Sequence, residues 1–189
     1  MRWRAPPAVS QSVGVEGHPA QPQHVVIMGV SGSGKTTLAE QLHGRLGWPY
    51  AEADDFHPQA NLDKMAAGVP LDDQDRSPWL KAIRDWLTRQ AHSGNCTIVT
   101  CSALKFAYRD VLREAEGRVR FVHLTADPAV IDERMSRRSG HFMPAALLPS
   151  QLATLQPLED DEDGITVVVD VAPALVADRV IEALGLGPN

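Results

Sequence analysis

Apolar residues along this chain fall into short blocks that alternate with stretches of helical periodicity. The blocks are rich in Val, Ile and Leu and are bounded by Gly, Pro or polar residues. Such short, continuous apolar runs are typical of strands buried in a parallel sheet. We predict strands over residues 25–28, 50–53, 97–101, 119–124 and 165–169.

The stretches between these blocks carry the start signals and apolar spacing of amphipathic helices. Strands that alternate with helices predict an α/β fold in which helices cover a parallel sheet. The chain contains no internal repeat. The expected helices are 35–46, 61–67, 78–93, 105–116, 128–139, 145–154 and 173–184.

The length of the chain, 189 residues, is enough for one full hydrophobic core and too short for two ordinary domains. Residues 1–23 contain several prolines together with Ser, Gln and Gly, and they show no apolar periodicity. Such a segment cannot bury enough surface to offset the entropy of ordering it. We therefore expect a disordered extension over 1–23 and one folded domain over 24–187.

Charge and composition limit the partners and the compartment. The net charge is −6 and no long basic stretch occurs, so we expect neither nucleic acid nor an anionic membrane surface as a partner. No apolar run approaches the roughly 18 residues of a membrane span, and the start of the chain lacks the apolar segment of a signal peptide. Cys96 and Cys101 have neither redox-pair nor zinc spacing, which favours two thiols in a reducing cytoplasm.

The first predicted strand leads into a glycine-rich loop that ends in Lys-Thr, and a predicted helix follows. Glycines let successive backbone N–H groups turn toward phosphate oxygens, and the helix adds the positive end of its dipole. Lys35 would reach the β- and γ-phosphates of ATP, and the Thr36 hydroxyl would contact Mg²⁺. The predicted nucleotide-binding residues are Gly29, Val30, Ser31, Gly32, Ser33, Gly34, Lys35, Thr36 and Thr37.

Two carboxylates follow the second predicted strand. Glu52 and Asp54 lie where that strand ends, and the carboxyl ends of parallel strands border the crevice in which phosphates bind. One carboxylate can organise Mg²⁺ while the other accepts a proton from a substrate hydroxyl. Asp54 is the candidate base and Glu52 the candidate metal residue; a solvated turn is the alternative for this pair.

Basic residues recur at helical spacing after the third predicted strand. Lys105 and Arg109 follow the crevice end of that strand and could hold an anionic substrate, although a salt-bridged surface helix would look the same. Arg134, Arg137 and Arg138 precede a Gly- and Pro-containing stretch that could hinge over the site. Arginines on such a lid can stabilise charge on a transferring phosphoryl group.

Three further features leave alternatives open. His57 has no second His or Cys at metal-ligand spacing, so hydrogen bonding to substrate or to neighbouring loops is expected. Arg76 could offer a two-pronged contact to a carboxylate, or it could pair with the acids beside it in the sequence. The acidic run 159–163 is expected to be a solvated loop.

Taken together, these motifs resemble the gluconate kinase family of small phosphate-loop kinases, which is related in fold to shikimate and nucleoside monophosphate kinases. The resemblance extends over most of the chain. It rests on Gly-Val-Ser-Gly-Ser-Gly-Lys-Thr at 29–36, Asp-Asp-Phe-His-Pro at 54–58, Asp-Asp-Gln-Asp-Arg-Ser-Pro-Trp-Leu at 72–80, Cys-Ser-Ala-Leu-Lys at 101–105 and Gly-His-Phe-Met at 140–143.

The resemblance implies a three-layer phosphate-loop fold with a helical lid and ATP-dependent phosphorylation of D-gluconate at its terminal hydroxyl. By position it implies that Asp54 activates the hydroxyl and that Arg134, Arg137 or Arg138 closes on the phosphates. The family is commonly dimeric, so a homodimer is possible. The residues that the resemblance places around the sugar acid are Asp54, His57, Lys64, Arg76, Lys105 and Arg109.

Two other functions remain open from the residues themselves. The phosphate loop carries no information about the acceptor, so a kinase for shikimate or for a nucleotide is the nearest alternative. A nucleotide-dependent switch or regulatory ATPase is the other. Asp127, after the fourth predicted strand, is a weak candidate for the acid of such a switch, while no Asn-Lys-x-Asp guanine signature occurs.

Overall fold

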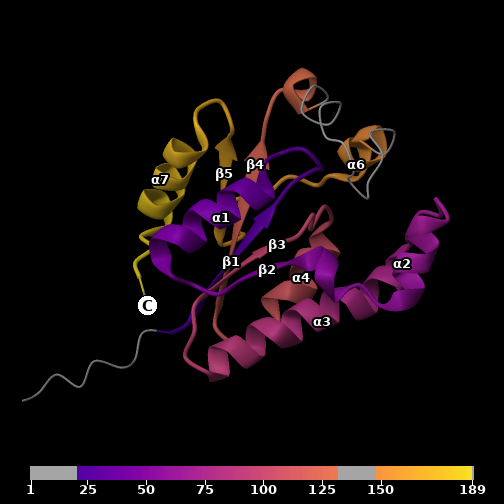
Figure 1. Ribbon diagram of the computed structural model, residues 1–189, viewed down its shortest axis with the longest axis horizontal. Coiled ribbons are helices and arrows are strands. Elements are labelled where there is room, and N and C mark those ends of the chain that lie inside the picture. Colours follow the sequence, from indigo (N-terminus) through magenta and orange to yellow (C-terminus); the bar gives the residue numbers. More distant parts are fainter. Residues whose placement is uncertain (1–20, 132–147, 189) are drawn as a thin grey trace, which may run out of the picture.

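The computed structural model describes residues 21–131 and 148–188, and within them it forms one five-stranded parallel sheet. The strand order is β2-β3-β1-β4-β5, so the first strand of the chain lies at the centre of the sheet (Figure 1). This arrangement confirms the predicted α/β class. The strands are β1 (Gln23–Met28), β2 (Tyr50–Glu52), β3 (Thr97–Thr100), β4 (Arg118–Thr125) and β5 (Gly164–Val168).

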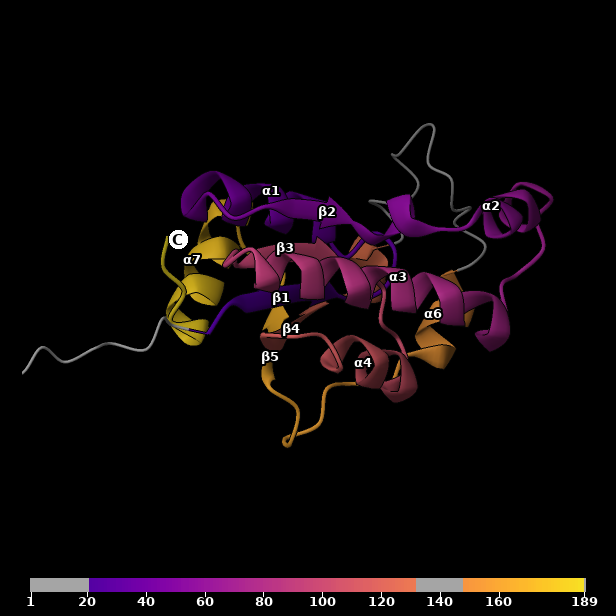
Figure 2. The ribbon, with the colours of Figure 1, turned by 90° about the horizontal axis from the view of Figure 1, so that it is seen from below.

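Helices follow the strands in alternation. Figures 1 and 2 both place α2 and α6 on the same side of the molecule, with α7 on the opposite side. A further helix begins at residue 128, and its described part runs to 131. The helices are α1 (Lys35–Leu46), the short 3₁₀ helix η1 (Ala53–Phe56), α2 (Gln59–Ala66), α3 (Asp73–His92), α4 (Phe106–Arg113), α6 (Leu148–Thr154) and α7 (Pro173–Leu184).

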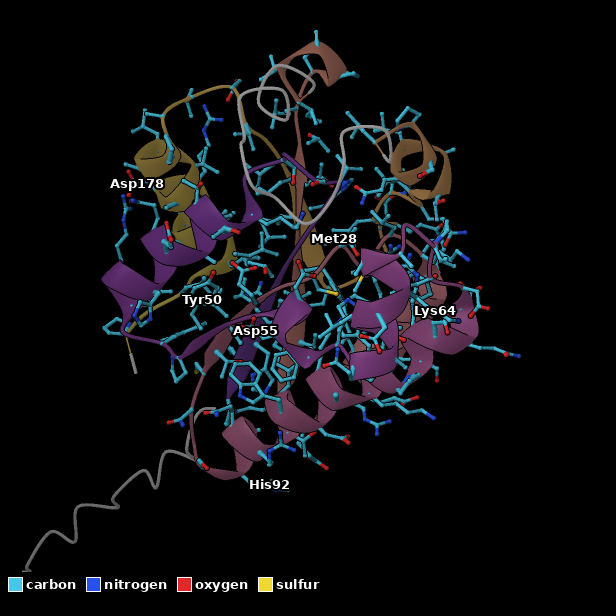
Figure 3. The ribbon with its side chains drawn as sticks, turned by 45° about the vertical axis from the view of Figure 1, so that its right-hand side comes forward. Met28, Tyr50, Asp55, Lys64, His92 and Asp178 are labelled. Atoms are coloured by element: carbon cyan, nitrogen blue, oxygen red, sulfur yellow. The ribbon has the colours of Figure 1, made fainter. Side chains whose placement is uncertain are left out.

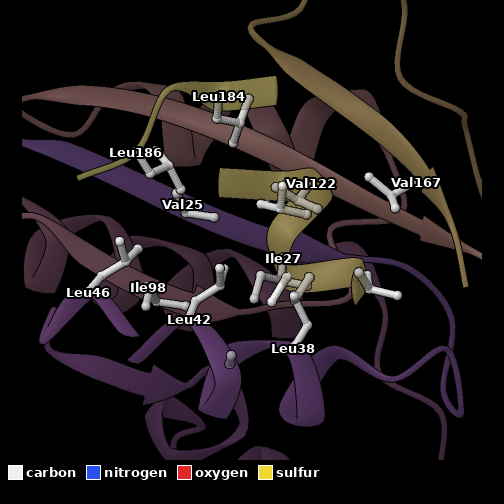
Figure 4. Close-up of a cluster of buried hydrophobic side chains, with 14 of the residues drawn as sticks. Val25, Ile27, Leu38, Leu42, Leu46, Ile98, Val122, Val167, Leu184 and Leu186 are labelled. Atoms are coloured by element: carbon white, nitrogen blue, oxygen red, sulfur yellow. The ribbon is translucent and has the colours of Figure 1, made fainter. Parts of the chain in front are cut away.

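One face of the sheet packs against α1 and α7. Val25 and Ile27 of β1 point into this layer, because side chains along a strand alternate between the two faces. Figure 4 shows Leu38 and Leu42 of α1 beside them, with Leu184 from the end of α7 in the same cluster. All five of these side chains are buried.

The opposite face of the sheet packs against α3 and α4. Val26 and Met28, the alternate residues of β1, face Trp79 and Ile83 of α3 and Leu112 of α4. Since β1 has apolar neighbours on both faces, its sequence is a continuous apolar run rather than an alternating one. The two faces complete the three layers.

Helix α3 differs most from its prediction. It begins at Asp73, whereas the sequence placed its start at Pro78. The Asp72 side chain accepts a hydrogen bond from the Asp75 backbone N–H, and the Asp75 side chain accepts one from the Asp72 N–H. This reciprocal capping box starts the helix five residues before Pro78, so the proline lies inside it.

Several expected segments lie outside the described residues. These are the extension up to residue 20, most of the helix expected over 128–139 and the first part of the helix expected over 145–154. At the boundary of the extension, β1 already begins at Gln23, and the Pro22 carbonyl accepts a hydrogen bond from the Arg118 N–H at 2.8 Å. Among the helices described here, none is long and apolar enough to cross a membrane.

Candidate active site

The candidate site lies where β1, β2 and β3 end. Because these strands are parallel, the phosphate loop after β1, η1 after β2 and the loop over residues 101–105 after β3 emerge at the same edge of the sheet. The Cys101 N–H donates to the Ile27 carbonyl at 3.0 Å, and the Gly29 N–H donates to the Ser102 carbonyl at 3.3 Å. The phosphate loop and the loop after β3 are therefore held side by side.

The phosphate loop depends on glycine at its first residue. Gly29 has a φ of 136°, and a Cβ at this position would lie 2.7 Å from the Leu124 carbonyl oxygen, which is too close for any side chain. The Lys35 ammonium donates to the carbonyls of Gly29 and Val30, at 3.1 and 3.0 Å. The side chain of Lys35, at the start of α1, thus folds back and binds the backbone of the loop.

Glu52 lies at the end of β2, where the sequence predicted a metal residue. Its carboxylate accepts hydrogen bonds from the hydroxyls of Tyr50 and Thr100. Burial, together with the neighbouring Glu52 charge, raises the pKa of Tyr50, so its hydroxyl stays protonated and keeps donating. Glu52 is therefore held in one orientation at the edge of the sheet from which the phosphate loop also emerges.

Asp54 is an exposed residue of η1, and this short helix rests on Trp79 of α3. The Trp79 indole N–H donates to the Ala53 carbonyl at 2.6 Å. The same indole stacks against the His57 ring, with centroids 4.5 Å apart and an angle of 10° between the planes. The buried Trp79 side chain thus contacts both η1, which carries Asp54, and the ring of His57, which follows it; the sequence assigned both of these residues to the acceptor.

His57 is a neutral hydrogen-bonding group in this setting. Burial lowers the pKa of His57 below 6.5. The Arg76 guanidinium also lowers this pKa, whereas the Asp54 carboxylate raises it. Its Nδ1 lies 3.3 Å from the side-chain nitrogen of the buried Asn61. Burial raises the pKa of Cys101, which follows β3, to about 12; the Asp54 carboxylate raises it further and the Arg76 guanidinium lowers it.

Three aspartates at the start of α3 all have partners. Asp72 caps the helix, as described above. Asp75 forms an ion pair with Lys64 of α2 at 2.6 Å, and Figure 3 shows Lys64 near the opposite end of α3 from His92. Asp73 forms an ion pair with Lys105 at 2.8 Å and also accepts from the Tyr108 hydroxyl, and these hydrogen bonds lower its pKa.

Arg76 remains without an ion pair among the residues that the structure describes. Its guanidinium lies 5.8 Å from the centre of the Tyr108 ring, and the Lys105 ammonium lies 5.4 Å from the same ring. The sequence left open whether nearby acids would neutralise Arg76. The structure answers that question, because lysines and the helix cap take those acids.

Arg109 is in a different environment from the one its sequence position suggested. The side chain is fully buried and its guanidinium forms a two-pronged ion pair with Glu162, at 2.6 and 2.7 Å. Its remaining N–H groups donate to the carbonyls of Ala103, Gln156 and Pro157. Every donor of Arg109 is used inside the protein, so we do not retain it as a substrate-binding residue.

The partner of Arg109 also corrects the reading of the acidic run 159–163 as a solvated loop. The Glu162 side chain is only 1% exposed, although its neighbours Asp160 and Asp161 are exposed. Burial alone would raise the pKa of Glu162, but hydrogen bonds from Arg109 and from the Glu159 N–H outweigh it and lower the pKa. One acid of this run is therefore part of the interior.

The Arg109 interactions also hold an unusual backbone in place. Ala103 has a φ of 42°, and among the described residues it is the one non-glycine residue in the left-handed region. Such a conformation costs about 1–3 kcal/mol and persists when surrounding contacts fix it. Here the Ala103 carbonyl accepts from Arg109 at 3.2 Å, next to the loop that carries Lys105.

Two functional candidates were missed or misjudged in the sequence. Tyr108 was not assigned a role, although it lies three residues after Lys105 on the same helical face, where side chains meet. Asp127 was considered as a switch acid, but its carboxylate accepts a hydrogen bond from the Ala129 N–H at 2.8 Å, where a helix begins. The predicted lid arginines, Arg134, Arg137 and Arg138, lie outside the described residues.

The fold and the phosphate loop define a phosphate-loop protein, and its relatives among known proteins are small-molecule kinases. A family model described as an AAA domain matches residues 25–158. The sugar kinase of Janibacter sp. HTCC2649, solved without ligand, superposes with a TM-score of 0.84 at 50% identity, covering 88% of this chain and 96% of that one.

Two further relatives identify the family. Gluconokinase of Gluconobacter oxydans (strain 621H) is 48% identical over 161 residues, which is 85% of this chain and 90% of the relative. The structure of a gluconokinase from Sinorhizobium meliloti 1021 superposes with a TM-score of 0.76 at 41% identity, covering 88% of this chain and 93% of that one. The chain belongs to the gluconokinase family.

Proposed function

We propose that the protein transfers the γ-phosphoryl group of ATP to the terminal hydroxyl of D-gluconate, giving 6-phospho-D-gluconate. Family membership supports a kinase that uses a nucleotide and a small alcohol acceptor. The observation that carries the choice of an anionic acceptor is Arg76. This half-buried guanidinium lies beside Lys105 and Tyr108 and has no ion pair in the described part of the chain.

The residues present divide into an acceptor side and a nucleotide side. We assign the gluconate carboxylate to Arg76, because a guanidinium offers two parallel N–H groups to a carboxylate. Lys105 and Lys64, which are paired with Asp73 and Asp75, would donate their remaining N–H groups to the sugar acid, and His57 would donate or accept a hydrogen bond. On the nucleotide side, Lys35 would leave the loop carbonyls and neutralise charge on the β- and γ-phosphates.

The transfer itself needs a base near the acceptor hydroxyl. In the proposed step, the hydroxyl oxygen bonds to the γ-phosphorus, the bond to the β–γ bridging oxygen breaks, and the hydroxyl proton passes to the Asp54 carboxylate. Positioning and charge neutralisation would supply most of the acceleration. Arg134, Arg137 and Arg138 are retained as proposed contacts of the phosphates.

We also propose that Mg²⁺ accompanies ATP. The residues present fit this ion, because Thr36 and Glu52 offer the hard oxygen atoms that it prefers, and the hydroxyls of Tyr50 and Thr100 keep Glu52 oriented. When bound, Mg²⁺ would neutralise charge that develops on the phosphates. Thr36 would contact it directly, and Glu52 directly or through water.

We further propose that the enzyme is cytoplasmic and forms a homodimer. A cytoplasmic location is supported by Cys96 and Cys101, neither of which forms a disulfide bond. A homodimer is the state expected from the family resemblance, and light scattering of the purified protein tests it. Neither statement affects the assignment of the reaction.

The reaction is tested by ADP release with ATP and Mg²⁺ in the presence of candidate acceptors. D-Gluconate should stimulate release strongly, while shikimate, nucleoside monophosphates and D-glucose, which lacks the carboxylate, should not. Stimulation by another acceptor would replace the substrate and keep the kinase. Slow release that no acceptor changes would refute the proposal in favour of a switch or regulatory ATPase.

The role of Asp54 has a matched control in its neighbour. Asp54→Asn should lower kcat by about 100-fold or more if this carboxylate is the base. Asp55→Asn removes an exposed carboxylate from the same 3₁₀ helix and should leave kcat within about twofold of the wild type. Equal rates for the two variants would remove Asp54 from this role.

A further inference from the structure

Residues 148–162, here called the brace segment, contact the nucleotide side of the site through α6. The side-chain oxygen of Gln151 accepts a hydrogen bond from the Ser31 backbone N–H at 2.7 Å. Ser31 is the third residue of the phosphate loop, so its N–H belongs to the set of amides that such loops present to phosphates. A side chain from a helix more than a hundred residues away thus binds the loop directly.

The same segment also contacts the acceptor side. The Gln156 N–H donates to the Leu104 carbonyl at 2.7 Å, and the Gln156 side-chain oxygen accepts from the Phe106 N–H at 2.6 Å. These two contacts lie on either side of Lys105, which is the N-cap of α4 and makes no side-chain cap of its own. Gln156 therefore supplies the cap that α4 lacks and fixes the backbone on both sides of Lys105.

Packing joins the two contacts into one unit. Val30 of the phosphate loop, Leu104 and Leu148 of α6 form a buried apolar cluster, and Leu155 packs against it. The Arg109 guanidinium donates to the Gln156 carbonyl at 3.0 Å and so ties the far end of the segment to the interior. A shift of α6 would consequently be transmitted to the backbone around Lys105.

We infer that Gln151 and Gln156 are positioning residues that couple the nucleotide site to the acceptor site. An N–H group has one hydrogen, so a phosphate oxygen that takes the Ser31 N–H weakens its bond to Gln151. The brace segment then shifts, and because Gln156 is hydrogen-bonded to the backbone of Leu104 and Phe106, the backbone around Lys105 shifts with it. This inference rests on the proposed function, because it takes Lys105 as part of the acceptor site.

Calorimetry gives the dissociation constant of gluconate twice, once with the protein alone and once with a non-hydrolysable ATP analogue and Mg²⁺ present. The ratio of the first constant to the second measures the coupling. The wild type should give a ratio that differs from one by about fivefold or more. Gln151→Met and Gln156→Met should each bring the ratio to within about twofold of one. The control is Gln90→Met. Gln90 lies near the C-terminal end of α3, away from Arg76, and its side chain accepts a hydrogen bond from the Asn95 side chain, so this variant should keep the wild-type ratio.

A second readout separates positioning from general loss of structure. Gln156→Met should raise the KM for gluconate about tenfold while the dissociation constant of the nucleotide changes less than twofold. Gln156→Glu keeps the acceptor oxygen for the Phe106 N–H and should restore most of the gluconate KM. The melting temperatures of all variants are recorded beside these values, so that partial unfolding is recognised.

Three results would overturn the inference. These are a wild-type ratio near one, a Gln151→Met ratio equal to that of the wild type, or a Gln156→Glu variant no better than Gln156→Met. Failure of the proposed function is a separate outcome, since the wild type would then not phosphorylate gluconate. In that case the same ratios are measured with the acceptor that the ADP-release panel identifies.

Discussion

Replacing Arg109 by Met tests whether this arginine is a structural residue or a ligand of the substrate. The substitution keeps most of the side-chain volume but removes the two-pronged partner of the Glu162 carboxylate, which is 1% exposed, and leaves it only the longer 3.5 Å ion pair with Arg113. It also removes the donors to the carbonyls of Ala103, Gln156 and Pro157. We expect a large loss of stability.

The magnitude follows from the burial of the pair. Removing one partner of a buried ion pair costs about 3–5 kcal/mol in the free energy of unfolding, because the other charge stays buried. For a domain of this size, 1 kcal/mol shifts the melting temperature by about 2–4 °C, so the variant should melt roughly 6–20 °C lower. Glu162→Met added to Arg109→Met removes both charges and should recover the part of the loss that the buried Glu162 carboxylate causes.

Urea unfolding at pH 7 measures the effect, with Arg84→Met as the control. Arg84 pairs with the exposed acids Asp85 and Glu114, and the loss of such pairs costs about 1 kcal/mol or less. The pH dependence adds a check. Without Arg109, burial should raise the pKa of Glu162, so the carboxyl is protonated on acidification and the deficit relative to the wild type narrows between about pH 7 and pH 4.

A deficit below about 1 kcal/mol for Arg109→Met, equal to that of the surface control, would refute the structural role. A raised gluconate KM for Arg109→Met with unchanged stability would be stronger evidence against the structural role. It would restore the interpretation of Arg109 as a substrate ligand that the sequence suggested.

Three other predictions concern the nucleotide, the acceptor and the response to pH. Lys35→Ala should abolish turnover with an unchanged circular dichroism spectrum, because the γ-phosphoryl charge loses its main protein counterpart; an active, folded variant would contradict the assignment. Arg76→Met should raise the gluconate KM by about 10- to 100-fold, the cost of a lost charge-assisted contact of roughly 1.5–3 kcal/mol, while the KM for ATP stays within about twofold. Burial lowers the pKa values of His24 and His123, so the stability they contribute is present above about pH 6.5 and is lost as the pH falls. Urea unfolding at several pH values should show this decline, and His123→Leu should flatten it.

The fold was predictable because its signals are local. Each strand of this sheet except the short β2 carries its own apolar run, and the phosphate loop lies between a strand and a helix in the sequence itself. The start of α3 was predicted wrongly, because Pro78 is a strong local signal while the capping box of Asp72 and Asp75 is a weak one. Local signals therefore predicted how many strands there are and where each lies along the chain, but not their order in the sheet, and they failed where two of them competed.

The environment of Arg109 could not be read from the sequence. Its partner Glu162 lies 53 residues away in a run of acids that has the composition of a solvated loop. Nothing in that run distinguishes the one buried acid from its exposed neighbours. The sequence also could not predict that Arg76 would have no ion pair among the described residues. That outcome depends on Lys105 and Lys64 pairing with Asp73 and Asp75 once the chain has folded.

The central position of β1 has a consequence for the synthesis of the protein. This strand is translated first, yet its partners β3 and β4 follow about 70 and 95 residues later, as the pairings of Val26 with Val99 and Phe121 demonstrate. Until residue 125 has left the ribosome, one edge of this strand, which carries the apolar run 25–28, is open to other chains. The growing polypeptide therefore carries an apolar strand with an unpaired edge for much of its translation, and during that interval a chaperone could protect it from aggregation.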